Sequence, residues 1–147
     1  MKKILAMALA LVLALSMSAV AFAENKTVKV GVVTDVGGVN DKSFNQTTWE
    51  GLEALAAENS AFEVNYLESK AESDYATNIE TFIDEDYDLI ICVGYMLAGA
   101  CREAAETYPD QKFAIIDDNT NEDLPNVACL MFSQQQASYL VGIVAGM

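Results

Sequence analysis

Short apolar runs alternate with amphipathic stretches along most of this chain, and no other feature constrains the fold as strongly. The runs at Val28–Val33 and Leu89–Val93 are almost continuously apolar, as expected for strands that are covered on both faces. Strands that alternate with helices form parallel sheets through right-handed crossovers. We therefore expect an α/β domain built on a doubly wound, parallel, five-stranded sheet.

Turn residues mark the ends of the expected elements. The five strands are Val28–Val33, Phe62–Leu67, Leu89–Val93, Phe113–Ile116 and Val127–Phe132. The helices are Phe44–Glu58, Asp74–Asp84, Leu97–Thr107 and a last one that opens at Ser133, where Gln136 completes a capping box. The sequence shows no clear helix between the fourth and fifth strands.

The first helix illustrates the expected packing. An apolar stripe at helical spacing is formed by Thr48, Leu52, Leu55 and Ala56. Gly51 costs about 1 kcal/mol relative to Ala in a helix interior, which indicates that the helix backbone lies close to the sheet. Trp49 borders the stripe, and we interpret it as a core or rim residue rather than a ligand-stacking one.

Residues 34–43 connect the first strand to this helix and combine glycines with polar side chains. Gly37 and Gly38 allow tight turns with positive φ. Ser43 is a good N-cap, and Gln46 three residues later completes a capping box. Ligands of open α/β sheets bind beyond the carboxyl ends of the strands, against helix N-termini. The connection is therefore either a ligand-binding loop or a polar turn before a well-capped helix.

The first 23 residues have the pattern of a secretory signal peptide. Lys2 and Lys3 form a positive region, residues 4–15 are apolar, and Ala21-Phe22-Ala23 is a small-x-small cleavage site. The apolar run is too short for a stable transmembrane anchor, so retention as an uncleaved anchor is the lesser alternative. We expect cleavage after Ala23 and an exported protein, in the periplasm or on the outer face of the plasma membrane.

Composition excludes several classes of function. Once Lys2 and Lys3 have left with the signal peptide, 6 basic residues face 22 acidic ones, a net charge of −16. Such a charge repels nucleic acid and anionic lipid surfaces. The chain has no histidine, the commonest general base and the commonest metal ligand. We expect no nucleic-acid partner, no metal and no cofactor.

Three cysteines are an odd number for an exported protein. Cys92 and Cys129 lie in apolar strand runs, and Cys101 lies on an expected helix. Their spacings match no zinc pattern. We interpret them as small buried hydrophobic residues.

Residues 35–52 read Asp-Val-Gly-Gly-Val-Asn-Asp-Lys-Ser-Phe-Asn-Gln-Thr-Thr-Trp-Glu-Gly-Leu, and this stretch resembles the signature of the basic membrane protein family. The Asp-Lys-Ser-Phe-Asn-Gln core at positions 41–46 is its most specific part. The resemblance runs from about Val28 to the last residue, through further matching segments at 88–95, 108–117, 125–127 and 137–142.

Members of that family are substrate-binding proteins of ABC transporters, related to bacterial purine-nucleoside receptors, and are not enzymes. The resemblance implies the first lobe of a type I periplasmic-binding-protein fold, with strand order 2-1-3-4-5. It also implies a nucleoside ligand and two membrane partners, the permease and the ATPase of an importer. Many members are lipoproteins with a cysteine at the cleavage point. The first cysteine here is Cys92, so a lipid anchor is not expected.

The family's binding residues can be carried over onto matching positions. In the family, the phenylalanine of the Ser-Phe-Asn motif stacks on the base, and polar residues around it bind the ligand. The resemblance assigns stacking to Phe44 and ligand hydrogen bonds to Asp35, Ser43 and Asp117.

Further candidates come from neighbouring positions. Asp118 is the alternative to Asp117, because the sequence does not fix the register between them. Asn45 belongs to the motif, although a helix position of this kind more often lies on the helix surface. Backbone groups after the third strand could meet a sugar at Gly94, Tyr95 and Met96. The side chains of Tyr95 and Met96 could equally cover only the cleft wall.

The last helix is apolar at Tyr139, Leu140, Ile143 and Val144 and reaches Met147 without a cap. Members of the family continue through a second lobe of similar size, which supplies the opposite stacking face. We therefore expect residues 24–147 to be the N-terminal lobe of a two-lobed substrate-binding protein, truncated before the second lobe. A lone lobe should bind nucleosides weakly, because it buries only part of the ligand.

Two alternative functions stay open. Residues 34–41 loosely resemble the strand-one motif of nucleoside hydrolases, Asp-Thr-Asp-Pro-Gly-x-Asp-Asp, which gathers carboxylates around Ca²⁺. Only Asp35 and Asp41 of those carboxylates are present here. The other alternative is a binding lobe for another small polar ligand, such as a sugar or an autoinducer. Sequence does not distinguish purine from pyrimidine nucleosides.

Overall fold

The computed structural model describes residues 27–147. The expected signal peptide, residues 1–23, therefore lies outside the described part of the chain. The strands are β1 (Val28–Val33), β2 (Phe62–Leu67), β3 (Leu89–Val93), β4 (Lys112–Ile116) and β5 (Val127–Leu130). The helices are α2 (Phe44–Glu58), α3 (Asp74–Asp84), the short 3₁₀ helix η1 (Tyr95–Leu97), α4 (Ala98–Thr107) and α5 (Gln134–Ala145).

The five strands form one parallel sheet in the order β2-β1-β3-β4-β5. Val30 of β1 pairs with Val64 of β2, and Ile115 of β4 pairs with Cys129 of β5. The structure confirms the predicted α/β class, the parallel sheet and its strand order. No helix separates β4 from β5. A loop over residues 117–126 makes that crossover instead.

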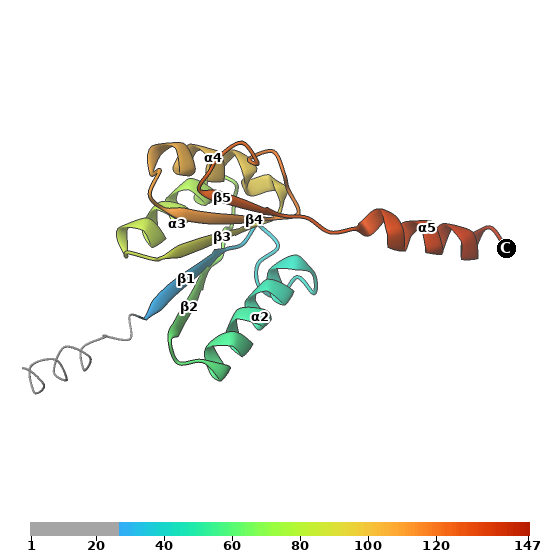
Figure 1. Ribbon diagram of the computed structural model, residues 1–147, viewed down its shortest axis with the longest axis horizontal. Helices are drawn as coiled ribbons and strands as arrows, with labels where there is room; N and C mark the ends of the chain where they lie inside the picture. The colour runs from blue at the N-terminus through green and yellow to red at the C-terminus, as the bar shows by residue number, and fades with distance from the viewer. Residues whose placement is uncertain (1–26) are drawn as a thin grey trace, which may run out of the picture.

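Helices cover both faces of the sheet, as Figure 1 shows. Helices α3 and α4 cover one face, where the larger core cluster includes Ile79, Phe82, Ile90 and Phe113. The other face carries α2 over a smaller cluster that includes Val32 and Ile91. The interior side chains of β1 and β3 therefore pack in both directions, which explains their continuous apolar runs.

Cysteine burial follows the prediction in part. Cys92 and Cys101 are fully buried in the larger cluster, whereas Cys129 is half-buried and packs against it. A direct hydrogen bond between the thiols of Cys92 and Cys101, together with burial, raises the pKa of Cys92 well above its ordinary value. Cys92 therefore stays a neutral core side chain.

The predicted apolar stripe of α2 is wrong in one position. Leu55 is 37% exposed, and Trp49 occupies the buried side together with Leu52 and Ala56. The Trp49 ring meets Tyr66 of β2 edge to face, with centroids 4.8 Å apart. Gly51 was expected to lie against the sheet, but a Cβ placed there would meet no atom within 4 Å. Gly51 therefore faces solvent.

Both predicted capping boxes are also wrong. The side chain of Ser43 makes no capping hydrogen bond. Asp41 caps α2 instead, accepting hydrogen bonds from the backbone N–H groups of Ser43, Asn45 and Gln46. Ser133 likewise makes no side-chain cap at the start of α5.

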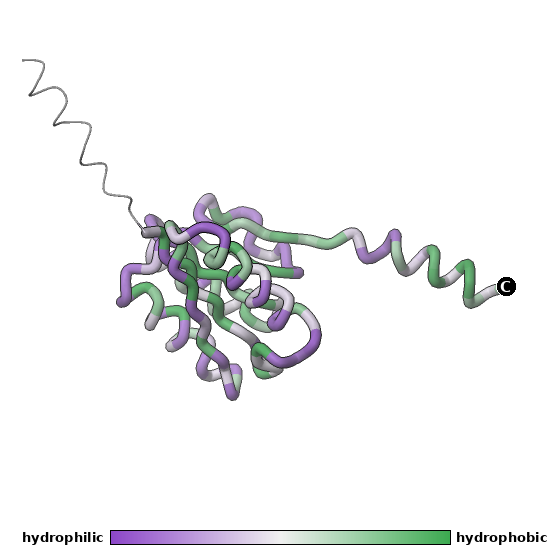
Figure 2. The backbone as a smooth tube through the Cα atoms, turned by 90° about the horizontal axis from the view of Figure 1, so that it is seen from below, coloured by the Kyte–Doolittle hydropathy of each residue, from purple (hydrophilic) through white to green (hydrophobic). Residues whose placement is uncertain are grey.

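Helix α5 projects away from the sheet, as both Figure 1 and Figure 2 show. Every residue from Leu130 to Met147 is exposed. The strand β5 ends at Leu130 rather than at the predicted Phe132. Within residues 27–147, no helix has the length and apolar content needed to cross a membrane.

Candidate ligand-binding site

The carboxyl edge of the sheet gathers most of the predicted site residues. Asp35 follows β1, Gly94 follows β3 and Asp117 follows β4. Because all strands are parallel, these three ends lie at the same edge. The first turn of α2 starts from this edge and adds Ser43, Phe44 and Asn45.

Asp35 is held in one orientation. Its Oδ1 accepts a hydrogen bond from the backbone N–H of Gly37 at 2.8 Å and from Asn45 Nδ2 at 2.7 Å. Asn45 is only 1% exposed, and its amide also donates to Asp41 Oδ2 at 3.0 Å. Asn45 therefore lies behind the mouth and fixes the carboxylate of Asp35, instead of lying on the helix surface.

Asp41 is the second anchor of this loop. Burial raises its pKa, but the N–H groups of Gln46, Ser43 and Asn45 and the Asn45 amide outweigh burial, so the pKa lies below its ordinary value. Both oxygens of Asp41 are occupied by these donors. In the described chain, no group of three or more His, Cys, Asp or Glu side chains could hold a metal ion.

Phe44 lies at the surface beside an apolar hollow. Its ring is 41% exposed and lies 5.4 Å from the ring of Phe132, with an angle of 46° between the planes. The hollow measures about 280 Å³ and is lined by Ser43, Phe44, Thr47, Thr48, Ile116 and Phe132. Phe132 was not predicted as a site residue, because nothing in its local sequence relates it to a motif 88 positions earlier (132 minus 44).

The segment after β3 turns sharply at Gly94, whose φ is 93°. The Gly94 N–H donates to the carbonyl of Ile116 at 3.0 Å, which ties this turn to the end of β4. Tyr95 is 70% exposed. Met96 packs against the larger core cluster under α4, so its side chain contributes to the wall rather than to the hollow beside Phe44.

Asp117 and Asp118 differ in their surroundings. Asp118 Oδ1 accepts hydrogen bonds from the N–H and the hydroxyl of Thr120, which closes a local turn. Asp117 has a positive φ of 62°, and among described residues its carboxylate has no hydrogen-bond partner. Among the described residues, Asp117 thus keeps both carboxylate oxygens open, whereas Asp118 keeps only Oδ2 open.

Arg102 of α4 fixes the loop that carries these two aspartates. Its guanidinium bonds both oxygens of Asp123, the carbonyl of Thr120 at 2.8 Å and Asn121 Oδ1 at 3.2 Å. Asn121 is buried and donates back to the carbonyl of Ala98 at 3.0 Å. The loop is thus bound to the start of α4.

Two further polar side chains reach this edge without having been predicted. Glu68, after β2, accepts hydrogen bonds from Lys70 at 2.7 Å and from the Val39 N–H at 3.0 Å, and these bonds lower its pKa. Tyr75, in the first turn of α3, is 3% exposed and has a raised pKa because of burial and the charge of Asp35. Both come from positions with no motif around them.

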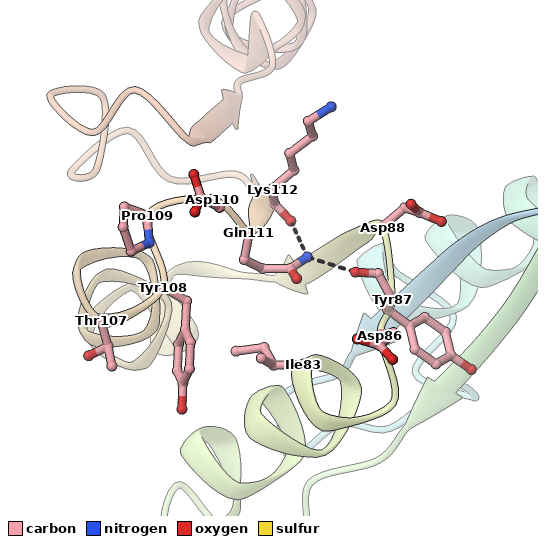
Figure 3. A pocket seen from close by; sticks show the side chains of 10 residues that line it. All are labelled: Ile83, Asp86, Tyr87, Asp88, Thr107, Tyr108, Pro109, Asp110, Gln111 and Lys112. Carbon is pink, nitrogen blue, oxygen red and sulfur yellow. Dashed lines mark hydrogen bonds between the residues drawn. The ribbon is translucent and has the colours of Figure 1, made fainter.

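A larger hollow of about 570 Å³ lies at the opposite, amino edge of the sheet (Figure 3). It lies between the segments that precede β3 and β4, and Gln111 Nε2 bridges these segments by donating to the carbonyls of Tyr87 and Lys112. None of the predicted site residues lines it. The chemistry at the carboxyl edge therefore identifies the candidate site, rather than the size of the hollow.

Comparison with known proteins shows the family to which this chain is similar. Residues 28–147 match the family model described as "ABC transporter substrate-binding protein PnrA-like". A CD4+ T-cell-stimulating antigen of Listeria monocytogenes is 45% identical over 127 residues, which cover 84% of this chain and 35% of that protein. The ABC transporter nucleoside-binding protein BmpA of Lactococcus lactis is 36% identical over 80% of this chain and 34% of its own length.

A solved structure of a solute-binding protein has a similar fold. An ABC transporter solute-binding protein from Aeropyrum pernix superimposes with a TM-score of 0.73 and 34% identity, over 80% of this chain and 32% of that one. The chain thus spans about a third of the length of these relatives. The match over residues 28–147 shows that this chain belongs to the PnrA-like family of ABC transporter substrate-binding proteins.

Proposed function

We propose that this chain is the N-terminal, ligand-binding lobe of the substrate-binding component of an ABC importer, and that its ligand is a purine nucleoside. The observation that carries the proposal is the pairing, at one mouth, of an exposed Phe44 ring with an Asp35 carboxylate held in place by Asn45. A nucleoside offers a flat base and a hydroxyl-bearing sugar, which match these two groups.

Each group has a chemical role in this proposal. The face of Phe44 stacks on the base, and base–aromatic stacking is worth about 1–3 kcal/mol per base. Asp35 and Asp117 accept hydrogen bonds from ligand N–H or O–H groups, and bonds to charged acceptors are stronger than neutral ones. The name of the nucleoside-binding relative from Lactococcus lactis supports this choice of ligand.

The rest of the proposal concerns the whole protein. We propose that residues 1–23 direct export and that a second lobe closes over the ligand, since the matched part of this chain covers only about a third of each relative. The permease and ATPase of the importer are the proposed partners. The isolated lobe should bind nucleosides weakly, because two-lobed binding proteins bury their ligands between lobes.

We propose that the protein binds its nucleoside ligand without hydrolysing it. A hydrolase of the Ca²⁺ type needs several free carboxylate oxygens, but both oxygens of Asp41 are occupied by donors of α2. Incubation with inosine and Ca²⁺ should therefore release no free base. Release of hypoxanthine at a rate proportional to protein concentration would contradict this part of the proposal.

A thermal-shift and calorimetry panel tests the ligand class. Inosine, guanosine and adenosine should raise the unfolding midpoint, whereas simple sugars should not, because only a ligand of the folded state stabilises it. Phe44→Leu keeps an apolar side chain but removes the aromatic face, so it should weaken nucleoside binding about tenfold. A midpoint raised by sugars and unaffected by nucleosides would favour the alternative sugar-binding function.

A further inference from the structure

We propose that Glu68 is a positioning residue of the candidate site, and that its carboxylate holds in place the turn that carries Asp35. The inference rests on the proposed nucleoside function, because it names a residue that acts on the ligand only through Asp35. Glu68 directly follows β2 and lies outside the motif that contains Asp35 and Phe44.

Asp35 opens a tight turn to which its own side chain is bonded. Its backbone carbonyl accepts the Gly38 N–H at 3.2 Å, and its Oδ1 accepts the Gly37 N–H at 2.8 Å. Asn45 Nδ2 donates to the same Oδ1 at 2.7 Å. The orientation of the Asp35 carboxylate therefore depends on where the backbone of this turn lies.

Glu68 holds this turn from the side of β2. Its Oε1 accepts the N–H of Val39, the residue after the turn, at 3.0 Å. Val39 is only 8% exposed, so its N–H has little access to water and depends on this acceptor. This hydrogen bond joins the loop that follows β1 to the end of β2.

The carboxylate of Glu68 also occupies the space beside Gly38. A Cβ placed on Gly38 would lie 2.7 Å from Glu68 Oε1, which is closer than real Cβ contacts, and Gly38 has a positive φ of 66°. The backbone of the turn thus approaches the carboxylate directly, which only a glycine allows. This contact explains why a glycine stands at position 38 of the motif.

The bonds of Glu68 favour a role in positioning rather than in direct contact with a ligand. Its second oxygen, Oε2, pairs with Lys70 Nζ at 2.7 Å, so both oxygens are bonded within the protein. The bonds from Lys70 and Val39 lower the pKa of Glu68, which keeps it ionised at physiological pH. Lys70 is 78% exposed, and exposed ion pairs contribute little to stability. The bond to Val39 is therefore the contact that should hold the turn.

The test measures the dissociation constant of inosine by nuclear magnetic resonance titration of the ¹⁵N-labelled protein. Glu68→Ala removes the acceptor and should bind inosine about fivefold to tenfold more weakly than wild type. Glu68→Asp keeps the charge but withdraws the acceptor by one methylene, so it should weaken binding in the same direction, and it replaces Glu68→Ala if that variant does not fold.

Two variants should bind as wild type does. Glu68→Gln keeps an acceptor oxygen for the Val39 N–H, so its affinity should lie within about twofold of wild type. Lys70→Gln is the matched control, because it removes the ion pair and leaves the bond between Glu68 and Val39 in place.

Two measurements on the ligand-free protein show whether Glu68 acts through the turn. In Glu68→Ala, amide hydrogen exchange at Val39 should become faster, because its N–H has lost its acceptor. The ¹³C resonance of the Asp35 carboxylate should shift in the same variant, because the turn that orients it has moved. Glu68→Gln and Lys70→Gln should leave the exchange rate and the resonance close to those of wild type.

The outcomes separate this inference from the proposed function. A wild-type protein that binds no inosine would overturn the proposed function, and the inference with it. Wild-type binding together with an unchanged affinity of Glu68→Ala and Glu68→Asp would overturn the inference alone. Weakened binding with an unchanged Asp35 resonance would also overturn it, because Glu68 would then act on the ligand without Asp35. Equal losses in Glu68→Ala and Lys70→Gln would contradict it as well, because the ion pair would then matter instead of the Val39 bond.

Discussion

The packing of the Phe82 ring against β1 requires a glycine at position 31. A Cβ placed on it would lie 2.7 Å from two ring atoms of Phe82, which is closer than real Cβ contacts. Phe82 is 1% exposed and packs in the larger core cluster, so it has no room to move away. Gly31 therefore lets α3 approach the centre of the sheet.

The two glycines Gly31 and Gly51 give opposite predictions. Gly31→Ala should lower the free energy of unfolding by about 1–3 kcal/mol, because it overpacks the core beside Phe82. Gly51→Ala should raise that free energy by about 0.5–1 kcal/mol, because the added methyl group meets open space and favours the helix. Urea unfolding of both variants and of wild type measures these changes in the free energy of unfolding. A stabilised Gly31→Ala would show that the packing around Phe82 is loose.

The Asp41 cap gives a pH-dependent prediction. The folded pKa of Asp41 lies below its ordinary value of 3.8, so its contribution to stability is complete above about pH 3.8 and is lost as pH falls through the lower folded value. At pH 7, Asp41→Ala should lower the free energy of unfolding by about 0.5–2 kcal/mol. The gap between wild type and this variant should close in acid.

Asp41→Asn is the matched control for that experiment. Asparagine keeps a capping oxygen but does not titrate, so this variant should lose less stability at pH 7. A gap between wild type and Asp41→Ala that stays constant from pH 7 to acid would contradict the assignment of the cap to a charged Asp41.

The sequence did not predict which of two residues, Ser43 or Asp41, caps helix α2. Both residues are good helix caps, and Ser43 with Gln46 matches the capping-box spacing. The backbone of Lys42, with a positive φ of 54°, turns the loop so that the Asp41 carboxylate lies over the helix end. A long-range bond from Asn45 to Asp35 then fixes this geometry, and spacing alone does not reveal it.

At the scale of elements, Asn126 links the end of α4 to the start of β5. Its side-chain amide donates to the carbonyls of Ala105, Tyr108 and Gln111 at 3.0, 3.3 and 3.1 Å. These carbonyls lie at the end of α4 and in the turn that follows it. One side chain therefore connects the helix end to the start of the edge strand.

Replacing Asn126 should loosen this junction. Asn126→Ala leaves half-buried carbonyls without a donor, so the free energy of unfolding should fall by about 1–3 kcal/mol. Amide hydrogen exchange should speed up most in β5 and at the end of α4. Asn119→Ala, on the exposed part of the same loop, is the control and should change little. Equal effects of both variants would contradict the role of Asn126.

Strands and helices were largely predictable from the sequence, because their signals are local. The bounds of β1, β2, β3, α2 and α3 agree with the predicted ranges. The face that α2 buries was predicted less well. Leu55 has the right spacing for the stripe, but Trp49 packs against Tyr66 on the buried side of the helix and Leu55 is 37% exposed. That contact joins two elements and has no local signature.

At the scale of the whole molecule, α5 is the part that the rest of the chain does not cover. Leu140, Val141, Val144 and Ala145 line one apolar hollow on this helix, and the first three are 63–73% exposed. Exposed apolar patches on soluble chains promote association. The proposed second lobe would cover this face in the complete protein.

The isolated chain should therefore self-associate through α5. Leu140→Glu combined with Val144→Lys adds an i,i+4 ion pair and leaves the net charge unchanged, so the helix itself should persist. This double variant should be monomeric at concentrations at which wild type associates, with an unchanged unfolding midpoint of the α/β body. Sedimentation velocity distinguishes the monomer from the associated form of each protein. A wild-type chain that stays monomeric at high concentration would contradict the prediction.

The candidate site was predictable only where a motif carries it. Asp35, Phe44 and Asn45 come from one short segment, and Gly94 and Asp117 follow strands that the apolar pattern reveals. Phe132 lies beside Phe44 although it comes from a distant segment, and nothing in its local sequence indicates this contact. The chain brings Phe44 and Phe132 together only in the folded structure, so this part of the candidate site could be found only from the three-dimensional arrangement.

The central claim, that ligands bind at the carboxyl edge of the sheet, is tested most directly by a nuclear magnetic resonance titration. The ¹⁵N-labelled protein is titrated with inosine to millimolar concentration, which also detects weak binding. The account predicts that the largest amide shifts occur at Gly37, Asn45, Gly94 and Asp117, whereas Tyr87 and Gln111 at the amino edge stay unchanged. Shifts confined to Tyr87, Gln111 and their neighbours would contradict it.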